Sequence, residues 1–142
     1  MKSVRLFTDG STRTNPGAGG WACILRYGKN ERVVTGGDPG PVTNNQMELT
    51  ALIEGLSVLR EPCEVEFFSD SRYLVDGCND WLLIWDMRGW KTARRRPIEN
   101  ESFWRKIWEF KKTHSIWGQW IKAHNGHTEN ERCDQLAKGA IP

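Results

Sequence analysis

Residues Val4-Arg-Leu-Phe-Thr-Asp9-Gly-Ser11 form a β-branched and aromatic run that stops at a Gly-Ser turn, which predicts a strand ending in a carboxylate. A near copy, Phe67-Phe-Ser-Asp70-Ser71, follows later in the chain. A lone aspartate in such a place more often caps a turn or a helix. If the two strands are parallel neighbours, however, both carboxylates meet at one edge of the sheet, where their repulsion calls for a cation.

The chain length and charge predict one domain, residues 1–142, with a local basic patch. The net charge is +2, and the stretch 88–96 holds five basic and no acidic residues. Removing those five charges leaves −3 for the rest of the chain. The patch, rather than the overall charge, therefore indicates an anionic partner. Its members are Arg88, Lys91, Arg94, Arg95 and Arg96.

The four cysteines form no C-x-x-C pair and no regular disulfide framework, which favours reduced thiols. We find no apolar run of membrane length and no signal peptide before the first strand. The expectation is a cytoplasmic protein with no membrane partner.

Hydrophobic periodicity predicts an α/β fold with a five-stranded mixed sheet flanked by helices. The expected strands are 4–11, 20–27, 31–36, 64–69 and 116–121, with a turn cluster at 38–41. The first three form an antiparallel meander, and the helical connection makes 64–69 parallel to the first strand. The expected helices are 43 to about 60, 71–79, a short one ending at Gly89, 99–112, and a last one that begins with a capping box of Thr128 and Glu131.

The helix that begins at Thr43, with Gln46 at capping-box spacing, carries an acidic residue on its apolar face. Glu48 falls in the middle of that face, whereas Ile53 falls on the polar side. A glutamate directed at a sheet must be paired, protonated or bound to a metal.

A fourth acid, Asp134, lies at the border of the apolar face of the last helix. Asp9, Glu48, Asp70 and Asp134 therefore have reason to converge. Hard oxygen ligands suit Mg²⁺ or Mn²⁺, and such convergence is typical of two-metal phosphoryl-transfer sites. A structural calcium site would use the same ligands but usually lies in one compact loop.

Five segments carry a recognisable combination of motifs: 7–11 (Phe-Thr-Asp-Gly-Ser), 43–49 (Thr-Asn-Asn-Gln-Met-Glu-Leu), 69–71 (Ser-Asp-Ser), 124–134 (His-Asn-Gly-His-Thr-Glu-Asn-Glu-Arg-Cys-Asp) and a basic protrusion over 81–104. In combination they resemble type 1 ribonuclease H. The resemblance runs in collinear order from about residue 3 to 138. It implies a single ribonuclease H catalytic domain that acts as a monomer.

The resemblance further implies a Mg²⁺-dependent endoribonuclease that hydrolyses the RNA strand of an RNA/DNA hybrid and leaves 5′-phosphate and 3′-hydroxyl ends. The four acids would hold two Mg²⁺ ions in the substrate complex, with Mn²⁺ as a possible substitute. His124 would assist proton transfer or product release, as suits an imidazole beside an anionic site. The alternative for His124 is a zinc site with His127 and Cys133, which lacks an evident fourth ligand.

The resemblance also assigns substrate contacts. Asn15, Asn44 and Asn45 fall where the family contacts RNA 2′-hydroxyls. Thr43 and Asn100 correspond to a pocket for a DNA phosphate, and Tyr73, Trp81 and Trp85 to a channel for the DNA strand. The basic residues at 88, 91 and 94–96 would attract phosphates, with a solvated loop as the alternative for 94–96. Taken singly, core packing is the expected role of Trp85, Trp90, Trp104, Trp108, Trp117 and Trp120.

The chain departs from the family pattern at Gln46, where an arginine is common, and at Asp86, in a helix that is often more basic. These departures predict weaker substrate binding than in strongly basic relatives. Two other functions stay open: a DNA-cutting nuclease of the same fold, and a catalytically silent hybrid-binding module. The three asparagines argue against the first, and retention of all four acids with His124 argues against the second.

Overall fold

The computed structural model describes residues 1–123 and 126–142. None of the helices in these two ranges combines the length and the apolar composition needed to cross a membrane. The strands are β1 (Lys2–Thr12), β2 (Gly17–Tyr27), β3 (Asn30–Val42), β4 (Cys63–Ser69) and β5 (Ser115–Trp120). The helices are α1 (Asn44–Ser57), α2 (Arg72–Asp76), the π-helical η1 (Gly77–Trp81), α3 (Leu82–Met87), α4 (Glu101–Thr113) and α5 (Thr128–Gly139).

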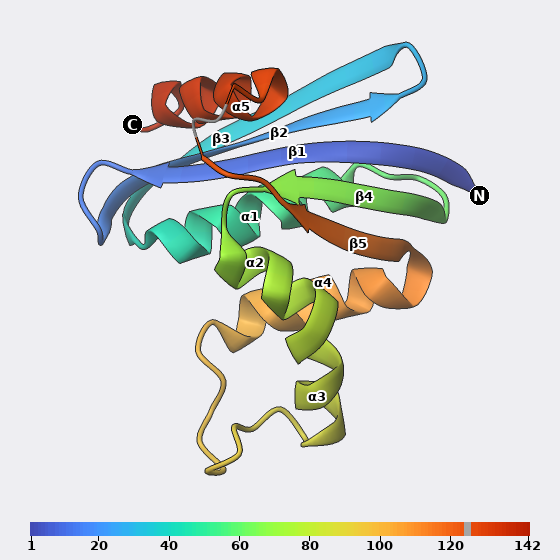
Figure 1. The fold of residues 1–142 in the computed structure, drawn as a ribbon. Coiled ribbons are helices and arrows are strands. Elements are labelled where there is room, and N and C mark those ends of the chain that lie inside the picture. The colour runs from blue at the N-terminus through green and yellow to red at the C-terminus, as the bar shows by residue number, and fades with distance from the viewer. Residues whose placement is uncertain (124–125) are drawn as a thin grey trace.

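The five strands form one mixed sheet in the order β3-β2-β1-β4-β5. The β1–β2 and β2–β3 pairs are antiparallel, whereas β1–β4 and β4–β5 are parallel. This topology confirms the predicted α/β sheet with 64–69 parallel to the first strand. Central position explains why β1 reads as an apolar run, since helices cover both of its faces (Figure 1).

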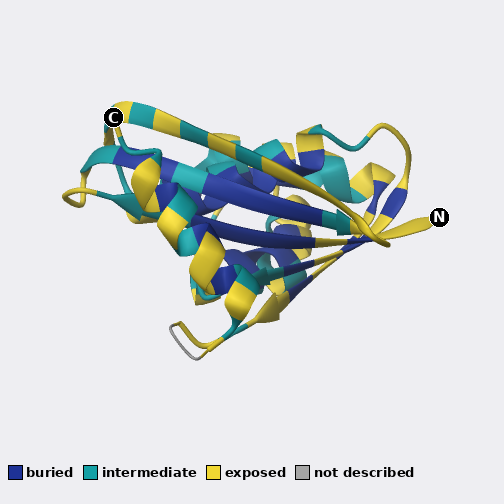
Figure 2. Cartoon of the chain, turned by 90° about the horizontal axis from the view of Figure 1, so that it is seen from above, coloured by how far each residue is buried: buried dark blue, intermediate teal, exposed yellow. Residues whose placement is uncertain are grey.

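Helices cover the two faces of the sheet unequally (Figure 1). One face packs on α1 and α4 around the fully buried Leu6, Phe67 and Trp104. On the other face α5 packs mainly on β1 and β2 and also contacts β3, over a small cluster of Phe7, Ile24 and Cys133 against which Phe68 of β4 packs. Figure 2 shows the resulting band of buried residues along the central strands. On that second face the β5 side chains of Trp117 and Gln119 are exposed.

The third strand is longer than the sequence predicts, and the expected turn cluster at 38–41 lies inside it. β3 pairs with β2 as far as Val42, which faces Gly17 across a β-bulge. β3 is an edge strand, where prolines are tolerated because one row of N–H groups has no sheet partner. Asp38 Oδ1 accepts a hydrogen bond from Gly40 N at 2.8 Å, so the turn chemistry is accommodated locally.

Helix boundaries confirm one predicted cap and correct another. Thr43 Oγ1 accepts from Gln46 N while Gln46 Oε1 accepts from Thr43 N, both at 3.1 Å, which completes the predicted capping box. The cap of α5 is His127 rather than Thr128, because the imidazole Nδ1 accepts from Asn130 N at 3.3 Å. Ile53 is buried rather than on a polar face, since α4 packs beside α1 and widens its apolar side.

The two short helices predicted after β4 form one continuous segment, α2–η1–α3, with a π-helical turn in the middle. A side chain at Gly77 would put its Cβ 2.1 Å from the Trp104 ring, so only glycine fits there. Within η1, the Asn79 amide donates to Gly118 O and accepts from Gly118 N, both at 2.8 Å. Asn79 therefore pairs with the outer edge of β5 as a further strand would.

We expect Asn79→Ala to lower the free energy of unfolding by about 2–3 kcal/mol, since it leaves an N–H and a C=O of β5 unpaired. Urea denaturation of both proteins measures the difference. Asn45→Ala, at an exposed position on α1, is the matched control and should stay within about 0.5 kcal/mol of the parent. Equal effects of the two substitutions would show that the Asn79 amide is not holding the edge strand.

Candidate active site

Three of the four predicted carboxylates meet at the end of the central strands. One oxygen from each of Asp9, Glu48 and Asp70 lies within 4.8 Å of the other two. Asp9 is 4% exposed and Glu48 is 7% exposed, whereas Asp70 is half-buried. We call these three residues the carboxylate cluster. Its members come from β1, α1 and the residue after β4, so the fold creates the site.

Strand register explains how β1 and β4 deliver their aspartates to the same place. Phe7 pairs with Phe68 in the parallel ladder, and Asp9 and Asp70 each follow two residues later. The phenylalanine rings stack at a centroid distance of 5.0 Å, in the small cluster that lies under α5. The repeated sequence pattern therefore records two strands that end side by side.

Close backbone approach at Gly10 brings Glu48 to Asp9. A Cβ atom at Gly10 would lie 2.4 Å from Glu48 N and 2.4 Å from the Met47 carbonyl carbon. Real Cβ atoms do not approach backbone that closely, so only glycine lets α1 pack on the end of β1. The sequence predicts a turn at Gly10-Ser11, but β1 continues through both residues to Thr12.

Burial and mutual repulsion make it unfavourable for all three carboxyl groups of the cluster to be ionised at once. Burial, with the negative charge of Asp70 adding to it, raises the pKa of the Asp9 carboxyl to about 7. Burial and then the charge of Asp9 raise the pKa of Glu48 well above its ordinary value. Without a cation, the cluster therefore holds protons near neutral pH.

A divalent cation fits this donor set. Glu48 Oε2 is buried, and it has no hydrogen-bond partner among the described residues. An unpartnered buried carboxylate oxygen is costly, and a cation at the cluster would satisfy it. Three carboxylates supply only hard oxygen donors, which suit Mg²⁺ or Mn²⁺ better than zinc.

Because its pKa is raised, Asp9 should destabilise the metal-free protein at alkaline pH. The unfolded chain loses this proton near pH 4 and the folded chain near pH 7, so stability falls as the pH rises across that window. We expect Asp9→Asn to raise the free energy of unfolding at pH 8 by about 2–4 kcal/mol, with no gain near pH 4. Urea denaturation in EDTA at both pH values measures this. An equal change at pH 4 and pH 8 would contradict the assignment.

Asp134, the fourth predicted ligand, lies beside the cluster rather than within it. A side-chain hydrogen bond with Asp134 and its negative charge both raise the pKa of Asp9, so the two carboxyls are neighbours. Among the described residues, however, the group within 4.8 Å contains only the other three acids. Asp134 forms an ion pair with Lys138 one turn along α5 at 3.0 Å.

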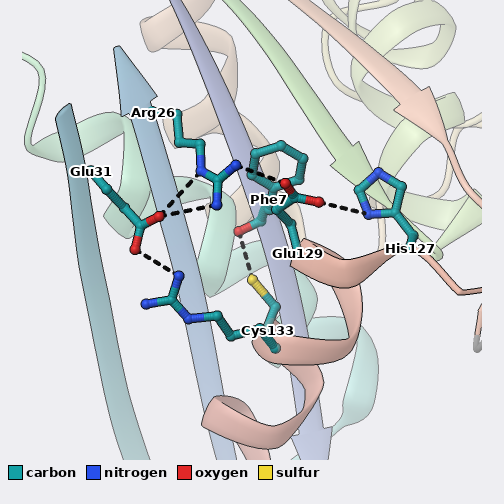
Figure 3. Close-up of polar contacts among 7 residues, drawn as sticks. Phe7, Arg26, Glu31, His127, Glu129 and Cys133 are labelled. Atoms are coloured by element: carbon teal, nitrogen blue, oxygen red, sulfur yellow. Dashed lines mark hydrogen bonds and ion pairs between the residues drawn. The ribbon is translucent and has the colours of Figure 1, made fainter. Parts of the chain in front are cut away.

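A network of ion pairs anchors the helix that carries Asp134 (Figure 3). Arg26 bridges Glu31 at 3.1 Å and Glu129 at 2.7 Å, and Arg132 pairs with Glu31 at 2.6 Å. The first two residues lie on β2 and β3, and the others on α5. The network therefore fixes α5 over β1 and β2, with Asp134 held next to Asp9.

The structure does not support the zinc alternative. His127 Nδ1 is used as the α5 cap, and the Cys133 thiol donates to Phe7 O at 3.1 Å. Burial raises the pKa of Cys133 to about 12, which keeps its thiol protonated. His124 and Asn125 lie outside the described residues.

The residues assigned to RNA 2′-hydroxyls gather where the β1–β2 loop meets the start of α1. Asn15 Oδ1 accepts from Asn44 N at 3.1 Å, and Thr12 Oγ1 donates to Asn44 Oδ1 at 2.6 Å. Asn45 is the next residue of α1, and all three asparagines are exposed. These side chains therefore form one polar surface beside Gly10 and the cluster.

The two residues assigned to a DNA phosphate are joined by Gln46. The Gln46 backbone N–H donates to Thr43 Oγ1 at 3.1 Å, and its side-chain amide donates to Asn100 Oδ1 at 3.3 Å. Asn100 Nδ2 in turn donates to the Tyr73 hydroxyl at 3.2 Å. The sequence predicts Gln46 only as a capping residue and as a departure from the family pattern, because its bridge to Asn100 exists only in the folded chain.

The aromatic residues assigned to the DNA channel form one continuous cluster. Tyr73 contacts Trp81 with ring centroids 5.8 Å apart, and Trp81 contacts Trp85 at the same distance. All three are half-buried, and they pack around the fully buried Trp104. They therefore support the core and also remain partly exposed to solvent.

The tryptophans differ in burial from the core-packing expectation. Trp90 and Trp104 are buried, and Trp85 and Trp108 pack against the core. Trp117 is 56% exposed and Trp120 is 36% exposed, so core packing is wrong for these two. Both lie on the edge strand β5, where Trp117 alternates with the buried Ile116 and Gly118 and Trp120 is the last residue of the strand.

The predicted basic patch is an exposed loop that stands away from the sheet, between α3 and α4 (Figure 1). A bridge between Lys91 and Pro97 closes it, and Trp90 is buried at its base. A groove of about 450 Å³ is lined in part by Arg88, Lys91 and Arg95. All five basic side chains are exposed: Arg88, Lys91, Arg94, Arg95 and Arg96.

Comparisons with known proteins agree with this geometry. The sequence profile of the RNase H family matches residues 1–141. The chain is 50% identical over 140 residues to Ribonuclease H of Erythrobacter litoralis (strain HTCC2594), covering 99% of this chain and 96% of that protein. It is 47% identical over 143 residues to Ribonuclease H of Rhizobium meliloti (strain 1021), covering 100% and 93%.

Among solved structures, one similar to this chain is LC9-RNase H1, described as a type 1 RNase H with the type 2 active-site motif. The TM-score is 0.86 at 30% identity, over 99% of this chain and 72% of that chain. Family profile, sequence relatives and fold agree over almost the full length, and so the chain belongs to the ribonuclease H family as a type 1 member.

Proposed function

We propose that this chain is an endoribonuclease that hydrolyses the RNA strand of RNA/DNA hybrids and leaves 5′-phosphate and 3′-hydroxyl ends. The observation that carries the proposal is the carboxylate cluster, in a chain of the ribonuclease H family. A binding module would gain nothing from three buried or half-buried acids facing phosphates, because their charges repel the substrate.

Asp9, Glu48 and Asp70 would hold two Mg²⁺ ions in the substrate complex, with Mn²⁺ as a substitute and Asp134 as a further ligand. When bound, the ions activate a water molecule and stabilise the leaving oxygen. The protein's own part is to keep the carboxylates in place: Gly10 admits Glu48, the β1–β4 ladder aligns the aspartates, and the α5 network holds Asp134. His124 would assist proton transfer or product release.

The exposed asparagines at 15, 44 and 45 would select RNA by contacting its 2′-hydroxyls, which DNA lacks. Thr43 and Asn100, joined by Gln46, would bind a DNA phosphate. Tyr73, Trp81 and Trp85 would line the path of the DNA strand. The basic loop supplies sequence-independent attraction through the exposed Arg88, Lys91, Arg94, Arg95 and Arg96.

We further propose that one chain, residues 1–142 as a single catalytic domain, acts as a monomer in the cytoplasm. One chain supplies every proposed metal ligand, so a second copy is not needed. The four cysteines are free and buried, which suits a reducing compartment.

Incubation with an RNA/DNA hybrid labelled on either strand tests the function. We expect cleavage of the RNA strand only, dependent on added Mg²⁺ and abolished by EDTA. Analysis of the product ends should find 5′-phosphates and 3′-hydroxyls. Cutting of the DNA strand would instead indicate a DNA nuclease of the same fold. Tight hybrid binding without cleavage, with either Mg²⁺ or Mn²⁺, would indicate a silent binding module.

A further inference from the structure

An exposed arginine lies at the rim of the carboxylate cluster and has no place in the function described so far. Arg72 is the first residue of α2 and follows Asp70 by two residues. Two chain steps separate Cα atoms by at most about 7.6 Å, so Arg72 is a close neighbour of the cluster. Nothing in the sequence alone distinguished this arginine from other surface cations.

Trp120 fixes the position of this arginine. The Arg72 Cζ atom lies 4.3 Å from the centroid of the Trp120 ring, in a cation–π contact. The indole Nε1 of Trp120 donates to the Asp70 carbonyl oxygen at 3.1 Å. One ring therefore links Arg72 to the backbone of a proposed metal ligand, and it holds a long side chain that would otherwise be mobile in solvent.

Apart from its contact with the Trp120 ring, the positive charge of Arg72 has no acidic partner among the ion pairs of the described residues. Its guanidinium takes part in no ion pair among the described residues, in contrast to Arg26 and Arg132, which are bound to Glu31. Stacking occupies the face of the guanidinium and leaves the N–H donors along its edge available. Those donors match the oxygens of a phosphate group, which a guanidinium binds through two parallel hydrogen bonds.

We propose that Arg72 binds a phosphate of the RNA strand next to the hydrolysed linkage, an inference that rests on the proposed function. The Trp120 ring orients the guanidinium before substrate arrives, so less side-chain freedom is lost on binding. Because the contact is to the backbone, it attracts every RNA sequence equally. The basic loop, in contrast, lies in a separate part of the fold, between α3 and α4 (Figure 1).

Salt dependence of catalysis distinguishes a phosphate contact from a structural role. We expect Arg72→Ala to lower kcat/KM for hybrid cleavage about five- to tenfold at 0.1 M salt, the contribution of roughly one released counterion. The slope of log kcat/KM against log salt concentration should become shallower by about 0.7–0.9. Arg72→Lys should retain the parent slope, because it keeps the charge. Thermal unfolding should be unchanged for both variants, since the side chain is exposed.

Lys29→Ala is the matched control, since it also removes one exposed positive charge, in the turn between β2 and β3. Asp9 pairs with Ala22, so Lys29 lies roughly 20 Å further along the sheet, at about 3.3 Å per residue. It should change neither rate nor slope. The proposal is overturned if Arg72→Ala and Lys29→Ala behave alike.

Whether the parent protein cleaves the hybrid tests the proposed function independently of Arg72. If the parent does not cut, hybrid binding by the metal-free proteins, followed by fluorescence anisotropy over the same salt series, still tests Arg72. The expected result is the same loss of slope for Arg72→Ala alone. Equal slopes for the parent and for Arg72→Ala would again overturn the proposal.

Discussion

Asp9→Asn is expected to lower kcat for hydrolysis of the RNA strand by about 10³-fold or more. Asp9 is the member of the cluster that touches both Glu48 and Asp134, so its charge is central to any cation held there. A metal site supplies several kcal/mol of charge stabilisation in the transition state, and each 1.36 kcal/mol is tenfold in rate. Steady-state kinetics on a labelled hybrid, with saturating Mg²⁺, measures the change.

Asp80→Asn is the control for this experiment, because Asp80 is an exposed aspartate on η1. It should leave kcat within about twofold of the parent. In EDTA the Asp9 variant should also be more stable than the parent at pH 8, so loss of activity cannot be attributed to an unfolded variant. Full activity of Asp9→Asn would remove this carboxylate from the mechanism.

Gly10→Ala is expected to reduce kcat/KM by on the order of 100-fold, although no proposed metal ligand is changed. The added methyl group would meet the backbone at Glu48 and Met47 at 2.4 Å, so α1 must move away from β1. A shift of about 1 Å in a catalytic group has an effect of this size on rate. Overpacking should also cost about 1–3 kcal/mol of stability. Kinetics and urea denaturation measure the two effects.

Gly139→Ala provides the matched control on α5, where a new Cβ would have no neighbour within 4 Å. It should be neutral or slightly stabilising, because alanine is the better helix former. If Gly10→Ala also keeps the parent rate, the close approach of α1 to β1 does not set the position of Glu48.

The central strands and the convergence of Asp9, Glu48 and Asp70 could be predicted because both are recorded in short local patterns. The segments ending at Asp9 and Asp70 share one pattern, and parallel neighbouring strands bring their ends together. Glu48 could be identified because an acid on an apolar helix face needs a partner. The convergence of these acids, which are far apart in the sequence, could therefore be predicted from local periodicity and from the parallel pairing of the two strands.

The errors occur where tertiary contacts outweigh local signals. Turn residues at 38–41 stay in β3, since an edge strand tolerates prolines. His127 replaces Thr128 as the cap of α5, because an imidazole nitrogen can accept the same hydrogen bond as a hydroxyl. Helix cover over β5 is a property of the whole fold, so exposure of Trp117 could not be read from its neighbours.

Residues that act through space were also missed. Gln46 joins Thr43 to Asn100 across more than fifty residues of chain, and only folding places them together. Arg72 on α2 is held in position by Trp120, which comes from β5. A single sequence contains neither contact.

Asp134 is predicted as a metal ligand in the same way as the other three acids. In the structure it lies at the side of the cluster and pairs with Lys138.

Crystals grown or soaked with Mn²⁺ test the central claim most directly, because anomalous scattering locates the ion without assumptions about activity. We predict a manganese peak within about 2.5 Å of a carboxylate oxygen from Asp9, Glu48 and Asp70. The same peak should be absent from crystals of Asp9→Asn. Ordered, saturated crystals in which these three carboxylates bind no ion would contradict the account.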